Sequence, residues 1–186
     1  MKIAVFGGSF DPPHLGHFEI IKRSLDQFDK IIIVPSKCTS QKNIPVATEN
    51  DRIIMLALMF SSFNNIEIDQ FELNSLNLSH TFLTIEYLKE KYLSAEFTLL
   101  LGTDQLKKFD SWYRADELLK SVNIYGFNRR DSMADSTYRF NIDMEFNIPY
   151  SSSEIKDLIH INCLDVSKML DTKVYDYIIQ NNLYQS

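Results

Sequence analysis

The first chemistry that the sequence suggests is phosphate binding near the start of the chain. Three of the five glycines, Gly7, Gly8 and Gly16, lie within the first sixteen residues. Glycine tolerates positive φ and lets the backbone approach a ligand closely, as a turn around phosphate requires. His14 and His17 share one face of the helical turn that follows, because residues three apart are neighbours on a helix. The segment therefore predicts an anion site at a helix start, with both imidazoles protonated beside the phosphate.

Three other interpretations of this segment have less support. Glycine pairs also occur in tight turns that bind nothing. A zinc site would need more ligands than His14, His17 and Asp11 provide, since structural zinc is held by four ligands. A nucleophilic Ser9 would need the Gly-x-Ser-x-Gly elbow, which the segment lacks. We therefore expect no dedicated metal site.

The elements that would hold this segment alternate between strands and helices. Apolar and β-branched runs predict strands over residues 2–6, 30–34, 66–69, 97–101 and 122–127. Apolar periodicity predicts helices over residues 18–28, 49–62 and 81–92, and a largely helical segment over 152–183 that begins with a Ser151–Glu154 capping box. This alternation predicts an α/β fold, a Rossmann-like doubly wound parallel sheet with helices on both faces and a C-terminal helical segment. Ligands bind such sheets at the carboxyl ends of the strands.

Two polar stretches are expected to lie outside these elements. The segment over residues 36–47 contains Pro45 and has no apolar period, so it predicts a loop. The segment from Asn128 to Asn147 is polar enough to predict a mobile excursion.

Composition narrows the class of protein. A chain of 186 residues, 45% apolar and 24% charged, predicts a single domain over residues 1–186. The net charge of −6 offers no basic surface for nucleic acid. No run of 18 apolar residues and no signal peptide are evident, which predicts a cytoplasmic protein without a membrane segment. Cys38 and Cys163 form no Cys-x-x-Cys pair and are expected to be free thiols in a reducing compartment.

Four segments, in order along the chain, resemble motifs of a known family. Gly7 to His17 is similar to Gly-Gly-x-Phe-Asp-x-x-His-x-Gly-His, the first motif of the nucleotidyltransferase superfamily. The segments Ser79–Ile85, Gly102–Gln105 with Trp112-Tyr113, and Tyr150–Lys156 resemble further motifs of bacterial nicotinate-nucleotide adenylyltransferases. The resemblance covers nearly the whole chain. It implies adenylyl transfer from ATP to nicotinate mononucleotide, giving nicotinate adenine dinucleotide and pyrophosphate in NAD biosynthesis, with Mg²⁺ bound to the ATP.

The resemblance also implies roles for individual residues. The implied catalytic residues are His14, His17 and Lys156. The implied ATP-binding residues are Gly7, Gly8, Ser9, Phe10, His14, His17, Gly102, Asp104, Arg129, Ser152 and Ser153. The implied acceptor-binding residues are Thr81, Trp112, Tyr113 and Asp104. Backbone N–H groups at a helix start suit a nicotinate carboxylate, and the only Trp of the chain offers a face for a pyridine ring.

Three positions depart from the family pattern or match it poorly. Lys156 stands where the family has Arg, so a planar two-pronged clamp becomes a flexible point charge. Arg129 is preferred over Arg130 for the adenine side of the site. Lys42 lies near a family phosphate contact, but a solvated surface lysine is the better interpretation.

The sequence leaves some alternatives open. The acceptor could instead be nicotinamide mononucleotide or another phosphorylated compound. A fragment of a class I aminoacyl-tRNA synthetase is disfavoured, because the chain has neither the length nor the charge for tRNA. A non-catalytic nucleotide-binding module would not need both His14 and His17. The sequence is also compatible with a homo-oligomer.

Overall fold

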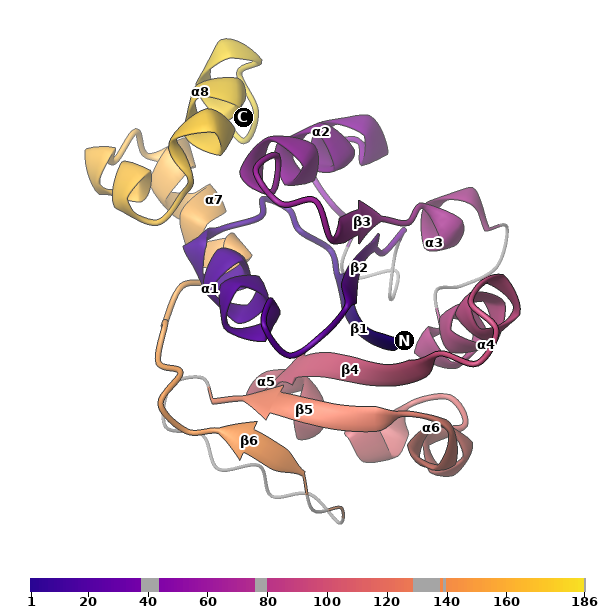
Figure 1. Ribbon diagram of the computed structural model, residues 1–186. Helices are drawn as coiled ribbons and strands as arrows, with labels where there is room; N and C mark the ends of the chain where they lie inside the picture. Colours follow the sequence, from indigo (N-terminus) through magenta and orange to yellow (C-terminus); the bar gives the residue numbers. More distant parts are fainter. Residues whose placement is uncertain (38–43, 76–79, 129–137, 139, 186) are drawn as a thin grey trace.

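The computed structural model describes residues 1–37, 44–75, 80–128, 138 and 140–185. Its strands are β1 (Lys2–Gly8), β2 (Lys30–Pro35), β3 (Ile66–Ile68), β4 (Glu96–Gly102), β5 (Asn123–Phe127) and β6 (Asn141–Asp143). These strands form one parallel sheet in the order β3-β2-β1-β4-β5-β6 (Figure 1). The winding direction reverses between β1 and β4, where folds of this kind bind their ligands. The predicted Rossmann-like parallel sheet is confirmed.

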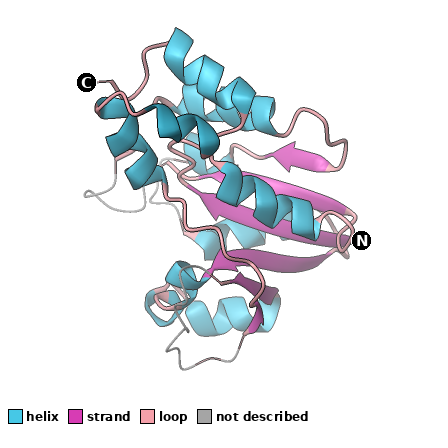
Figure 2. Cartoon of the chain, turned by 90° about the vertical axis from the view of Figure 1, so that its left-hand side faces the viewer, coloured by secondary structure: helices cyan, strands magenta, loops and turns pink. Residues whose placement is uncertain are grey.

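Helices cover both faces of the sheet. They are α1 (Leu15–Ser24), α2 (Glu49–Met59), α3 (Phe71–Asn74), α4 (Thr81–Lys91), α5 (Thr103–Leu106), α6 (Ala115–Ser121), α7 (Ser152–His160) and α8 (Thr172–Gln180), with 3₁₀ turns η1 (Phe109–Ser111) and η2 (Leu164–Lys168). Figure 1 shows α1, α2, α7 and α8 on one side of the sheet and α4 and α6 on the other. Figure 2 shows the strands side by side, with the start of the chain at one end of them.

The two apolar cores follow from the alternation of side chains along each strand. In β1, Ala4 and Phe6 pack against α1, α2, α7 and α8, whereas Ile3 and Val5 pack against α4 and α6. Consecutive side chains of a strand point to opposite faces, so a strand buried on both faces is apolar throughout. This explains why the central strands appear in the sequence as continuous apolar runs.

The predicted elements match the structure apart from small differences. The helix expected over residues 49–62 ends at Met59, and the one expected over 18–28 runs from Leu15 to Ser24. The strand expected at 66–69 is one residue shorter, and the one expected at 97–101 is one residue longer at each end. Residues 152–183 form α7, η2 and α8 rather than one continuous helix. The prediction of an excursion from Asn128 to Asn147 is wrong in part, because β6 pairs with β5 and Phe146 is buried. Residues 129–137 and 139 of that segment lie outside the described residues.

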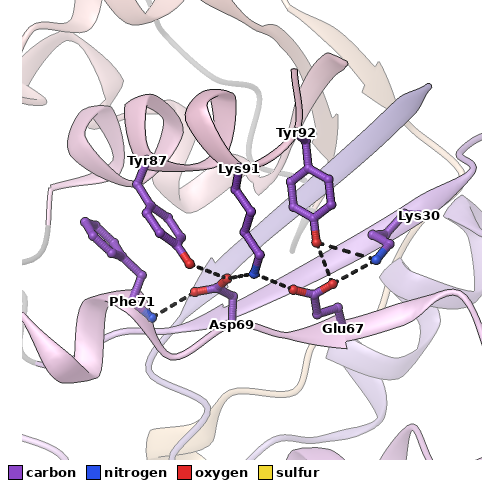
Figure 3. Close-up of polar contacts among 7 residues, drawn as sticks. All are labelled: Lys30, Glu67, Asp69, Phe71, Tyr87, Lys91 and Tyr92. Atoms are coloured by element: carbon purple, nitrogen blue, oxygen red, sulfur yellow. Dashed lines mark hydrogen bonds and ion pairs between the residues drawn. The ribbon is translucent and has the colours of Figure 1, made fainter. Parts of the chain in front are cut away.

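A charged network joins β3 to α4 (Figure 3). Glu67 of β3 accepts hydrogen bonds from Lys30 (2.8 Å), Lys91 (2.7 Å) and the Tyr92 hydroxyl (2.6 Å). Burial alone would raise the pKa of Glu67, but these three donors outweigh it and lower the pKa to about 2. The carboxylate therefore holds the end of α4 against an edge strand of the sheet.

The same network continues to α3. Lys91 also donates to Asp69 (2.7 Å), which accepts from the Tyr87 hydroxyl (3.3 Å) and from the backbone N–H of Phe71 (2.9 Å) at the start of α3. Asp69 is 5% exposed, and these donors replace the water that a buried carboxylate loses. Asp69 thus fixes α3 and α4 relative to each other, and both helices contribute to the site described below.

The Glu67 interactions predict an acid-sensitive contribution to stability. Because the folded-state pKa lies below the ordinary value of 4.5, the stabilisation is complete above that pH and is lost as the pH falls towards 2. We expect Glu67→Gln to lower the free energy of unfolding at pH 7 by on the order of 1 kcal/mol, after allowance for solvent screening. The difference from the unmodified protein should shrink at pH 3, as measured by urea unfolding at both pH values.

Glu86→Gln is the matched control, because Glu86 pairs with Lys89 on the exposed side of α4. This variant should change the free energy of unfolding by less than about 0.5 kcal/mol. A deficit in Glu67→Gln that stays constant from pH 7 to pH 3 would contradict the assignment.

Candidate functional site

Two adjoining cavities open at the carboxyl ends of β1 and β4. The larger has a volume of about 450 Å³ and the smaller about 180 Å³. Their common lining consists of Gly7, Gly8, Ser9, Leu101, Gln105 and Ser152. The shared wall is therefore the loop after β1, together with residues at the end of β4 and the start of α7. This position at the reversal of strand order is the one that the fold predicts for a ligand.

His14 and His17 line the smaller cavity and together cap the start of α1. Nδ1 of His14 accepts a hydrogen bond from the N–H of Gly16, and Nδ1 of His17 accepts one from the N–H of His14, both at 3.1 Å. Their rings stack with centroids 3.7 Å apart. Each Nδ1 is an acceptor, so the ring hydrogen lies on Nε2 and each imidazole is neutral.

The prediction that both histidines are protonated concerns a site that holds a phosphate, so it stays a prediction. In this structure the Nδ1 atoms of both rings accept backbone hydrogen bonds. If Nδ1 carried a hydrogen, that hydrogen would point at the backbone N–H that Nδ1 now accepts, and the hydrogen bond that caps α1 would be lost. Two positive rings stacked this closely would also repel each other. In this geometry the pair presents two ring N–H donors at the positive end of a helix.

The glycines are needed for space rather than for unusual backbone angles, because no glycine in the described residues has positive φ. A Cβ at Gly8 would lie 3.1 Å from the ring of Phe10, and a Cβ at Gly16 would lie 2.8 Å from the ring of His14. A Cβ at Gly7 would have its nearest neighbour 4.0 Å away, at the wall that both cavities share. The expected close approach of backbone to ligand thus fits Gly7, whereas Gly8 and Gly16 make room for aromatic rings.

Phe10 supports the loop from beneath. Its side chain is 1% exposed, its φ is 49°, and its ring packs edge-on against His17 at 5.0 Å. The structure thus places the aromatic ring of this predicted ATP-binding residue behind Gly8, where it packs under the glycine backbone.

Arg52 anchors the loop from inside the protein. It is 1% exposed, and its guanidinium donates to the carbonyls of Ser9 (2.6 Å) and Ser36 (2.8 Å). These two carbonyls follow β1 and β2, so one side chain of α2 fixes the ends of two neighbouring strands. Burial lowers the pKa of Arg52, while the charges of Asp11 and Glu49 act in the opposite direction.

Asp11 is a buried carboxylate of the loop after β1, with 2% exposure, and it lines the larger cavity. Its Oδ2 accepts from Lys156 Nζ (2.8 Å) and from the N–H of Val46 (2.9 Å). Its Oδ1 accepts from the N–H of Ala47 (3.0 Å) and from the hydroxyl of Tyr184 (2.9 Å). Burial alone would raise the pKa of Asp11, but these four donors outweigh it and hold the pKa below its usual value.

The start of α7 lies against the loop after β1. Ser152 Oγ donates to the carbonyl of Pro12 (2.9 Å), and Ser151 Oγ accepts the N–H of Glu154 as the predicted helix cap. Ser152, Ser153 and Lys156 all line the larger cavity. The predicted phosphate-binding hydroxyls and the predicted cation are thus brought together.

The far wall of the larger cavity is formed by α3, α4 and the segment after η1. Thr81, Thr84 and Trp112 line it, with Glu72 of α3. The Thr84 hydroxyl donates to Glu72 at 2.7 Å, which joins the two helices that Asp69 also holds together. Among the predicted acceptor-binding residues, Thr81 and Trp112 face this cavity.

Tyr113 does not line either cavity. Its side chain is 50% exposed and lies against the rings of His80 (4.8 Å) and Phe82 (6.2 Å). The Trp112-Tyr113 pair is therefore divided, with Trp112 at the cavity and Tyr113 packed outside against the start of α4.

Gly102 and Asp104, both predicted to bind ATP, line the smaller cavity at the end of β4. Arg129, Arg130, Lys42, Ser79 and Cys38 lie outside the described residues, and Cys163 is a free, half-buried thiol. Within the part of the chain that the structure describes, no three His, Cys, Asp or Glu side chains are grouped to hold a metal ion, and no helix is long and apolar enough to cross a membrane.

Sequence reasoning missed Asp11, Arg52 and Glu72 as parts of the site. Asp11 carried a signal, because it is a fixed position of the first motif, but it was considered only as a third metal ligand. Arg52 and Glu72 appear in the sequence as ordinary charged residues of predicted helical or loop segments, and their burial depends on contacts between distant elements.

Comparisons with known proteins agree with this geometry. The family model described as cytidylyltransferase-like matches residues 5–158. A protein of Chlorobium phaeobacteroides named probable nicotinate-nucleotide adenylyltransferase is 33% identical over 203 residues, covering 100% of both chains. One of Aliarcobacter butzleri with the same name is 37% identical over 150 residues, covering 78% of this chain and 82% of its own.

A solved structure also shares the fold. The nicotinic acid mononucleotide adenylyltransferase of Plasmodium falciparum, complexed with NaAD, aligns with a TM-score of 0.79 at 24% identity, covering 98% of this chain and 97% of its own. The motifs at the shared wall, the strand order and the relatives that match over the full length agree. The chain belongs to the nicotinate-nucleotide adenylyltransferase family.

Proposed function

We propose that the protein transfers the adenylyl group of ATP to nicotinate mononucleotide, giving nicotinate adenine dinucleotide and pyrophosphate. The observation that carries this proposal is that two cavities meet at the loop after β1. His14 and His17 line one cavity and Lys156 lines the other. A transfer between two nucleotides needs two pockets that meet where the phosphates react, and membership in the family supports the assignment.

In this proposal the smaller cavity holds the adenosine side of ATP and the larger holds the acceptor. The ATP phosphates cross the shared wall and reach Ser152, Ser153 and Lys156 at the edge of the larger cavity. Gly7 brings backbone close to the phosphates, while Asp104 accepts ribose hydroxyls. The larger cavity offers Trp112 as an aromatic face for the pyridine ring. The first N–H groups of α4, at Thr81 and Phe82, have no partner within the helix and suit a carboxylate.

The reaction is proposed to be a direct displacement. A phosphate oxygen of the mononucleotide attacks the α-phosphorus of ATP in line, and pyrophosphate leaves. That phosphate is largely ionised at neutral pH, with a second pKa of about 6, so no general base is required. The Nε2–H groups of His14 and His17 and the ammonium of Lys156 would stabilise the charge that develops on the phosphate oxygens.

Mg²⁺ is proposed to arrive with ATP. The two cavities fit this role, since the Asp11 carboxylate that lines the larger one is committed to four donors, and no acidic cluster is present in the described residues. Phosphate oxygens and water would supply most of the ligands, and the ion would neutralise the leaving pyrophosphate. The cytoplasmic location expected from the sequence remains a prediction.

The acceptor assignment can be tested by pyrophosphate release from ATP with nicotinate or nicotinamide mononucleotide. We expect a higher kcat/KM with nicotinate mononucleotide than with nicotinamide mononucleotide. The start of α4 offers N–H donors that suit the nicotinate carboxylate, whereas the amide group of nicotinamide carries no charge. The coupled assay should use equal concentrations of the two acceptors. A higher kcat/KM with the amide would contradict the assignment.

The role of the histidine pair can be tested with His17→Ala. We expect turnover to fall by about 100-fold or more, because one donor to the reacting phosphate is lost. The variant also loses the helix cap on the N–H of His14, which should cost about 1 kcal/mol of stability. Steady-state kinetics and thermal unfolding would separate the two effects.

Two further variants serve as controls. His17→Gln offers an amide oxygen to the N–H of His14, so it should regain stability but not turnover. His160→Ala, at the exposed end of α7, should change neither. Turnover close to that of the unmodified protein in His17→Ala would overturn the proposed mechanism.

A further inference from the structure

Tyr184 carries a buried hydroxyl that the proposed mechanism does not use. It follows α8 and is only 5% exposed. Its hydroxyl donates a hydrogen bond to Asp11 Oδ1 at 2.9 Å. The packing of α8 beside α2 brings it there (Figure 1). Burial and the Asp11 charge raise the pKa of Tyr184, so the hydroxyl keeps its hydrogen and remains a donor.

The backbone at this position is also unusual. Tyr184 has φ of 63°, a left-handed conformation that a bulky residue rarely adopts. Such a conformation persists only where the surrounding structure holds it. Apolar packing of the ring would be served equally well by phenylalanine, so the hydroxyl needs a separate explanation.

Asp11 connects this hydroxyl to the site. One carboxylate oxygen accepts from Tyr184, and the other accepts from Lys156, whose side chain is 27% exposed and lines the larger cavity. Lysine is a point charge on a flexible stem, so its ammonium needs an anchor to be held in one place. The orientation of the Asp11 carboxylate supplies that anchor, and the Tyr184 hydroxyl helps to fix the orientation.

We propose that Tyr184 is a positioning residue that acts through Asp11 to place the ammonium of Lys156 for the phosphates of ATP. This inference rests on the proposed function. The hydroxyl also shares the negative charge of Asp11. Without the Tyr184 hydroxyl, the Asp11 carboxylate would attract the Lys156 ammonium more strongly and would be less fixed in its own orientation. Lys156 would then be less available to a phosphate.

The test is Tyr184→Phe, which removes the hydroxyl and keeps the ring. The matched control is Tyr177→Phe, because Tyr177 lies in α8 and its hydroxyl donates to the Asp51 carboxylate of α2 at 2.8 Å. The two variants lose a hydroxyl–carboxylate bond of similar length, but Asp51 is not bonded to Lys156 in the structure. ATP affinity is measured by calorimetry without any acceptor, and kcat and KM are measured with nicotinate mononucleotide.

We expect Tyr184→Phe to weaken ATP binding by about 3- to 10-fold, in keeping with the loss of a hydrogen bond to a charged group. Tyr177→Phe should stay within about twofold of the unmodified protein. In a Lys156→Met background, Tyr184→Phe should change ATP affinity by less than about twofold, because the residue through which it acts is gone.

Two results would overturn the inference. One is an equal change of ATP affinity in Tyr184→Phe and Tyr177→Phe, which would indicate a purely structural bond. The other is an undiminished effect of Tyr184→Phe in the Lys156→Met background. Failure of the proposed function is distinguishable, because it would appear as absent turnover with nicotinate mononucleotide in the unmodified protein, while ATP affinity still reports on Tyr184.

Discussion

The buried carboxylate of Asp11 is the interaction on which the rest of the site depends. A carboxylate with 2% exposure is unfavourable unless several donors replace water. Here the donors come from the segment before α2, from α7 and from the turn after α8, through Ala47, Lys156 and Tyr184. These segments are far apart along the chain, so one buried charge of the loop after β1 holds them together at the carboxyl end of the sheet. Removing any of these donors would leave the charge less compensated, and the placement of the others would change with it.

Around this charge, the loop after β1 is fixed from several directions. Arg52 holds the carbonyl of Ser9 from within, and Ser152 holds that of Pro12 from α7. The ring of Phe10 lies beneath Gly8, where a side chain would collide with it. A loop held in this way presents its backbone to a phosphate without having to become ordered on binding, which reduces the entropic cost of recognition. Rigidity of the loop is therefore a consequence of buried polar contacts rather than of the glycines themselves.

The sequence could predict features that depend on neighbouring residues. The parallel sheet follows from apolar runs that alternate with helical periodicity. The Gly7–His17 segment could be predicted as an anion site because its residues are close in sequence, from the end of β1 to the first turn of α1. Contacts such as Asp11 with Lys156, 145 residues apart, or with Tyr184, 173 residues apart, leave no local pattern. The orientation of the histidine rings was also not predictable, since it follows from which ring nitrogen caps the helix. β6 was missed because three residues carry too short an alternation to indicate a strand.

These contacts also determine how the site would respond to a nucleotide. Because each histidine Nδ1 accepts a backbone hydrogen bond and Lys156 is bonded to Asp11, the site offers less positive charge than its residue types suggest. An arriving phosphate would compete with Asp11 for Lys156, and part of that attraction would offset the loss of the existing pair. The Asp11 carboxylate would still be stabilised after Lys156 leaves it. The charge of the buried Arg52 lies nearby, and three hydrogen-bond donors remain, from Val46, Ala47 and Tyr184. These remaining donors thus lower the cost of moving the Lys156 ammonium from the Asp11 carboxylate to a phosphate. The buried network that holds the loop in place therefore also allows Lys156 to bind the phosphate.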